Sequence, residues 1–90
     1  MRYAITYKEN IFTESQPAAD MEKCSSVTFE NIGDDPITLN AGIPLQVGNS
    51  IVYENLPNEF INQTFKIVFA GTGTAPRILV IKKFATPSKF

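Results

Sequence analysis

Apolar and polar side chains alternate along much of the chain, which is the pattern of half-buried β-strands. The regular stretches are 26–30, 37–39, 43–47, 50–54 and 65–69. Residues 3–7 alternate only in part. Residues 78–84 (ILVIKKF) are apolar on both faces through their middle, as expected for a central strand that is covered on both sides. The pattern predicts about seven short strands.

Turn-forming residues separate these stretches, notably at 31–36 (NIGDDP), 40–42 (NAG) and 71–76 (GTGTAP), the last expected as a hairpin-like loop. Pro44 has no backbone N–H, so its segment either belongs at a sheet edge or is only loosely extended. Ile and Val total 15 against four Leu, which favours strands over helices. We therefore predict an all-β fold, a small antiparallel β-sandwich of Ig-like or jelly-roll-like type.

The segment 8–24 has no clear periodicity. Within a single domain spanning residues 1–90, it is predicted to be a long loop, either a surface connection or an arm that reaches a neighbouring subunit. The one ordered element expected in it is a short helical turn near 17–23, because Pro17 is tolerated in the first turn of a helix.

One part of the sequence resembles a known type of module. Residues 26–54 contain an Asn31-x-Gly33 turn, the strand residues Ile37 and Leu39, and then Leu45, Gly48 and Ser50. This pattern is similar to that of small Ig-like β-sandwich modules. The chain as a whole resembles short all-β proteins encoded among the structural genes of tailed bacteriophages, which often close with a basic strand like that at 78–84. The resemblance implies a virion component without catalytic residues.

Candidate chemistry is sparse. The chain has no His and a single cysteine, Cys24, which excludes zinc fingers, Cys–His catalysis and an intrachain disulfide. The 71–76 loop lacks the Lys-Ser/Thr ending and the following helix of a phosphate-binding loop. Five acidic residues could form either solvated turns or a weak cation site: Asp20, Glu22, Glu30, Asp34 and Asp35. We predict no enzyme activity, no cofactor and no metal site.

The net charge of −1 conceals an uneven distribution. Residues 1–35 hold seven acidic and three basic residues, whereas residues 36–90 hold two acidic and five basic residues. The two parts could neutralise each other within one chain, or the acidic part of one copy could contact the basic part of the next. The basic residues are scattered, so we expect no nucleic-acid partner. The absence of a ~20-residue apolar run and of a signal-peptide core predicts no membrane partner and synthesis in a host cytoplasm without secretion.

These features predict a non-enzymatic structural protein of a phage virion: a capsid decoration protein or a head–tail or tail subunit. Its partners would be other virion proteins and copies of itself. The expected contact residues are Phe60, Ile61, Arg77, Leu79, Ile81, Lys82, Lys83 and Phe84. The alternative is an Ig-like binding module that recognises a carbohydrate or a cell-surface protein, with tyrosine side chains as the binding platform.

Overall fold

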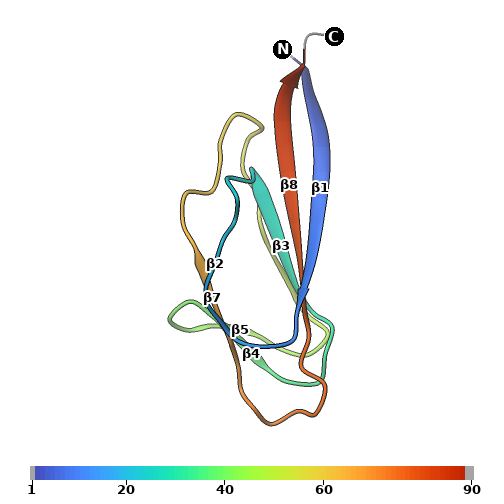
Figure 1. The fold of residues 1–90 in the computed structure, drawn as a ribbon, viewed down its shortest axis with the longest axis vertical. Helices are drawn as coiled ribbons and strands as arrows, with labels where there is room; N and C mark the ends of the chain where they lie inside the picture. Colours follow the sequence, from blue (N-terminus) through green and yellow to red (C-terminus); the bar gives the residue numbers. More distant parts are fainter. Residues whose placement is uncertain (1, 89–90) are drawn as a thin grey trace.

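The computed structural model describes residues 2–88, and every regular element in this range is a β-strand (Figure 1). The predicted all-β fold is confirmed, with eight strands rather than about seven. They are β1 (Arg2–Phe12), β2 (Gln16–Ala19), β3 (Ser26–Asn31), β4 (Ile37–Leu39), β5 (Ile43–Leu45), β6 (Ser50–Tyr53), β7 (Phe65–Phe69) and β8 (Ile78–Ser88).

The strands form two antiparallel sheets of four strands each. Sheet A has the order β1-β8-β3-β6, and sheet B has the order β2-β7-β4-β5. The pairs β1·β8, β2·β7, β3·β6 and β4·β5 are those of one long hairpin that folds back on itself. The pairing β3·β8 joins two of these pairs into sheet A, and the pairing β4·β7 joins the other two into sheet B. This nested order is that of a jelly roll, the second of the two sandwich types predicted, and differs from the Ig order.

The core lies between the inner faces of the two sheets. Alternate residues of β3, β4, β7 and β8 point into it, which is why these strands alternate in the sequence. Three rings from both sheets pack together: Phe29 lies 4.9 Å from Phe65 and 6.1 Å from Tyr53, measured between ring centroids. Aromatic contacts of this kind tie sheet A to sheet B.

The segment 8–24 differs from its prediction. The helical turn expected near 17–23 is wrong, because residues 16–19 form β2 and pair with β7. Residues 8–12 belong to β1, so the segment is not one long loop. The chain instead reverses at Glu22 and Lys23, whose φ angles are 54° and 58°. Pairing with β7 satisfies the backbone groups that a helical turn would have satisfied internally.

The predictions for the Pro44 strand and for the 71–76 loop have different outcomes. Pro44 does lie on an edge strand, because β5 is the last strand of sheet B. The 71–76 loop is not a hairpin: it leads from β7 in sheet B to β8 in sheet A. In a jelly roll these consecutive strands belong to opposite sheets.

The molecule is elongated, with extents of 49 × 21 × 17 Å. The two longest strands, β1 and β8, cause this shape, because they pair over eleven residues and extend past the sandwich as a two-stranded ribbon (Figure 1). β3 pairs with β8 only from Lys83 to Ile78. β1 is the first strand of sheet A, so one side of its backbone lies at a sheet edge.

Candidate protein interaction surface

The outer face of sheet A is apolar along its central strand. In β8, Ile78 and Val80 point into the core and are buried, whereas Leu79 and Ile81 point the other way and are only half-buried. No strand of the described chain covers this face, since the fold has two layers and sheet B lies against the other side. The apolar strand predicted to be covered on both sides is therefore covered on one.

Neighbouring strands extend the apolar surface. Residues opposite each other in an antiparallel pair share a face, so Ile11 lies beside Leu79 on the outer face of sheet A. Ile11 is 56% exposed, and Tyr7, opposite Lys83, is 65% exposed. We call the whole set the outer-face patch: Ile5, Tyr7, Ile11, Val52, Leu79 and Ile81. On the same face, Glu9 lies opposite Ile81, and the β3 residues Thr28 and Glu30 separate β8 from Val52. Several exposed apolar side chains on one sheet face are typical of an interaction site.

The structure separates the eight predicted contact residues. Leu79, Ile81 and Lys83 lie together on the outer face of sheet A, and Arg77 is exposed just before β8. Four others lie elsewhere: Lys82 is buried, Ile61 and Phe84 pack against the core, and exposed Phe60 lies under the Lys23 ammonium, 5.9 Å from the ring centroid.

The sequence interpretation missed the contribution of β1. Tyr3, Ile5 and Tyr7 alternate with smaller residues, and Ile11 continues the same parity four residues later. Lys8, Glu9 and Asn10 interrupt the apolar pattern, which made the strand look finished at Tyr7. Extending the parity across that polar stretch would have found the rest of the strand.

Lys82 is held inside by an acidic side chain from the β2–β3 turn. Its ammonium lies 2.8 Å from one carboxylate oxygen of Glu22, and the Lys8 ammonium lies 2.7 Å from the other. Lys8 and Lys82 are opposite each other in the β1–β8 ladder, so Glu22 bridges two like charges and offsets part of their repulsion. These hydrogen bonds lower the pKa of Glu22 to about 2. The contact joins the acidic first part of the chain to its basic last strand within one molecule.

Two aspartates fasten the two connections at one end of the sandwich. The Asp35 carboxylate accepts hydrogen bonds from the backbone N–H groups of Gly71 (2.9 Å) and Thr72 (3.2 Å). The Asp34 carboxylate accepts from the N–H groups of Thr74 (3.0 Å) and Ala75 (2.9 Å). Side-chain oxygens thus satisfy backbone donors that the loop could not satisfy itself.

These hydrogen bonds bear on two sites considered from the sequence, a phosphate-binding loop at 71–76 and a weak cation site at the acidic residues. The N–H groups of the 71–75 loop that a phosphate would need already donate to carboxylates of the same chain. The five acidic residues do not gather, and within residues 2–88 no group of three or more Cys, Asp or Glu side chains could hold a metal ion. The carboxylates of Asp34 and Asp35 thus bind backbone N–H groups of the same chain and have a structural role.

We expect the fold to lose stability below about pH 4. Burial alone would raise the pKa of Asp35, but the hydrogen bonds from the N–H groups of Gly71 and Thr72 have the larger effect, so its pKa is lowered. The hydrogen bonds from Ala75 and Thr74 likewise lower the pKa of Asp34. In the unfolded chain the pKa of an aspartate is ~3.9. A carboxyl group whose pKa is lower in the folded chain stabilises the fold above pH ~3.9, and this contribution is lost as the pH falls through the folded pKa.

Thermal unfolding followed by circular dichroism at pH 7, 5, 4 and 3 checks this expectation. The double variant Asp34→Asn, Asp35→Asn should have a lower Tm at pH 7 and a smaller fall in Tm between pH 5 and pH 3 than the natural chain. An equal fall in both proteins would show that these aspartates do not cause the acid sensitivity.

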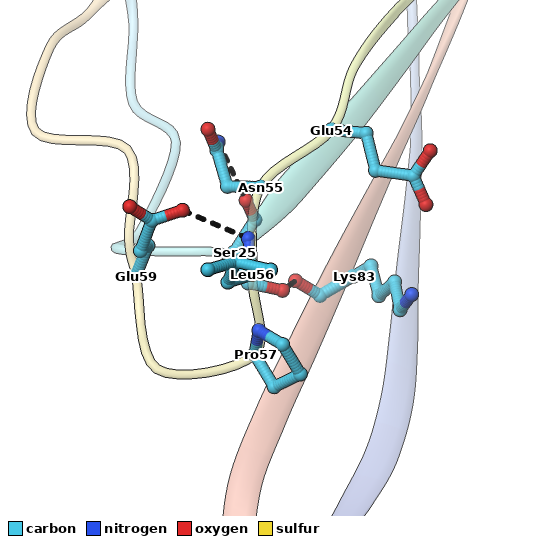
Figure 2. A pocket seen from close by; sticks show the side chains of 7 residues that line it. All are labelled: Ser25, Glu54, Asn55, Leu56, Pro57, Glu59 and Lys83. Atoms are coloured by element: carbon cyan, nitrogen blue, oxygen red, sulfur yellow. Dashed lines mark hydrogen bonds between the residues drawn. The ribbon is translucent and has the colours of Figure 1, made fainter.

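A shallow pocket of about 490 Å³ lies between the loop after β6 and the β8 residue Lys83 (Figure 2). Its polar side chains are partly engaged: the Glu59 carboxylate accepts the Leu56 N–H at 2.9 Å, and the Asn55 amide donates to the Ser25 carbonyl at 2.8 Å. Glu54 and Lys83 add one charge of each sign to the lining. Figure 2 shows these groups spread around the rim rather than converging on one point.

The strand order and the outer-face patch together define a small jelly-roll domain with an apolar sheet face. Comparisons with protein-family models, curated proteins and solved structures find no match to this chain. None of the described residues forms a helix that could cross a membrane.

Proposed function

We propose that this protein is a non-enzymatic structural subunit that acts through protein–protein contacts made by the outer face of sheet A. The observation that carries the proposal is the outer face of β8, where the half-buried Leu79 and Ile81 are not covered by a second layer and Leu79 lies beside the exposed Ile11. A chain of 90 residues buries a modest fraction of its surface alone, so a partner on this face adds substantially to its stability.

We further propose that the subunit belongs to a phage virion, where its partners are copies of itself and other virion proteins. Two arguments support this assignment. The sequence resembles short all-β proteins from phage structural genes, and the jelly roll is a recurrent fold of viral capsid proteins. The second argument is an analogy at the level of the fold.

The outer-face patch can be tested by introducing one charge at its centre. Ile81→Lys is expected to abolish self-association and leave the Tm within a few degrees of the natural value, because position 81 is outside the core. The matched control is Thr38→Lys, which places the same charge on the exposed outer face of sheet B. Light scattering across a range of protein concentrations measures the effect. A natural chain that stays monomeric throughout, or an Ile81→Lys variant that still assembles, would contradict the proposal.

A second candidate function, recognition of a carbohydrate, is favoured by one observation. A groove of about 540 Å³ beside the 54–63 loop is lined by Tyr53 and Phe60 and by the amide side chains of Asn55, Asn62 and Gln63. Aromatic and amide groups suit sugar rings and hydroxyls, and jelly rolls occur in lectins. Specific binding of the natural chain to a glycan array supports this candidate, and a blank array excludes it for the glycans displayed.

A further inference from the structure

We propose that two copies of this chain pair through their β1 strands, antiparallel and centred on Tyr7, so that their A sheets form one continuous eight-stranded sheet. This inference rests on the proposed function and names both the partner and the geometry of the contact. It concerns the edge of sheet A, whereas the proposed function concerns its outer face.

The edge of β1 has the features of a pairing strand. β1 is eleven residues long, contains no proline and pairs with β8 without a register shift. The other edge strands are shorter: β5 has three residues including Pro44, β2 has four with Pro17 and an irregular register, and β6 has four. Short strands, proline and bulges are the usual protections against edge pairing, and β1 has none of them.

The direction of the backbone groups follows from the ladder. The Ser25 N–H donates to the Lys83 carbonyl, so Lys83 directs its backbone groups toward β3. These directions alternate along a strand, so Lys82 faces β1 and bonds its register partner Lys8. Along β1 the even-numbered residues therefore bond β8. The odd-numbered residues direct their N–H and C=O groups toward the sheet edge. These residues are Tyr3, Ile5, Tyr7, Glu9 and Ile11.

Charge selects the register. With the twofold axis at Tyr7, the middle of β1, all eleven residues pair and no like charges face each other: Lys8 lies opposite Thr6 of the second copy, and Glu9 lies opposite Ile5. An axis at Lys8 or at Glu9 places that residue opposite itself, and an axis at Ile5 places Arg2 opposite Lys8.

The other registers without facing like charges pair fewer residues, and even the axis at Thr6 leaves Ile11 and Phe12 unpaired. The register at Tyr7 provides about ten backbone hydrogen bonds, two for each odd-numbered residue. It also brings the two Tyr7 rings together on the outer face, where they join the outer-face patches of the two copies into one surface.

Proline substitutions test the edge. Ile5→Pro removes an N–H that points to the edge, so it should leave the fold intact and weaken dimerisation by about 10-fold or more. Ile5→Ala is the matched control, because it shortens the same side chain and keeps the N–H. Thr6→Pro removes an N–H used in the β1–β8 ladder and should instead lower the Tm.

Disulfide cross-linking tests the register, in a Cys24→Ala background. Tyr7→Cys places two Cα atoms about 5.5 Å apart across the axis, within the range of a disulfide. Ile5→Cys places them about 14 Å apart, because they are also offset by four residues along the strand, and is the matched control. Under mild oxidation the Tyr7→Cys variant should form at least ~10-fold more covalent dimer than the Ile5→Cys variant.

The outcomes separate the two proposals. A dimer that survives Ile5→Pro and is lost in Ile81→Lys overturns the edge pairing and leaves the outer-face function standing. Equal cross-linking of the two cysteine variants, or none while the protein is dimeric, also overturns the edge pairing. A natural chain that is monomeric at every concentration overturns both.

Discussion

Replacing Phe29 with alanine is expected to remove about 3–5 kcal/mol from the free energy of unfolding. Phe29 is fully buried on β3, and its ring contacts the rings of Tyr53 in the same sheet and Phe65 in the other. A chain of this length has a total stability of about 5–13 kcal/mol, so the variant should lose about a quarter or more of it. Urea denaturation followed by circular dichroism measures the loss.

The matched control removes an equally large ring from the surface. Phe60 is 55% exposed and contacts the Lys23 ammonium, so Phe60→Ala should cost about 1 kcal/mol or less. A loss at Phe29 no larger than the loss at Phe60 would mean that the three rings do not hold the two sheets together.

Replacing Gly33 with alanine is expected to cost about 1–3 kcal/mol, a large effect for a single methyl group. The new Cβ would lie 2.5 Å from the Ala75 carbonyl oxygen and against the backbone nitrogen of Arg77. Both neighbours are backbone atoms that cannot rotate away. The 31–36 and 70–77 connections would have to separate, which also strains the hydrogen bonds of Asp34 to Thr74 and Ala75.

Gly42→Ala provides the control, because a Cβ at that position has no heavy atom within 4 Å. Its Tm should equal or slightly exceed that of the natural chain, since alanine restricts the unfolded state more than glycine does. Thermal unfolding of the two variants side by side measures the difference. Similar Tm values for both would show that the two connections are not in close contact.

The sequence predicted those parts of the fold that depend on local pattern. Phe65, Ile67 and Phe69 alternate with polar or smaller residues and do form β7, and Pro44 lies at an edge as its missing N–H requires. The turn at 31–36 also behaves as predicted, because the Asn31 side chain accepts the Gly33 N–H. Side-chain periodicity and turn chemistry are encoded by near neighbours, so one sequence suffices to find them.

Pairing between strands that are far apart in the chain could not be predicted from local pattern. Residues 16–19 (QPAA) have no strand pattern of their own and become β2 because β7 lies beside them. Likewise, Lys82 looked like a surface residue until Glu22, sixty positions earlier, was found beside it. The interaction surface was predicted in part for this reason: β8 carries a strong local signal, whereas β1 contributes through its place next to β8.

The β1–β8 ladder also has a consequence for folding kinetics. It joins residues that are between 66 (Phe12 to Ile78) and 86 (Arg2 to Ser88) positions apart in the chain. Pairings this distant give a high contact order, which is associated with folding in milliseconds to seconds rather than microseconds. Because β8 lies between β1 and β3, sheet A cannot become continuous until residues 78–88 have emerged during synthesis. Until then both edges of β1 are exposed. The strand that we propose to join two copies is therefore also among the last to be paired within its own chain.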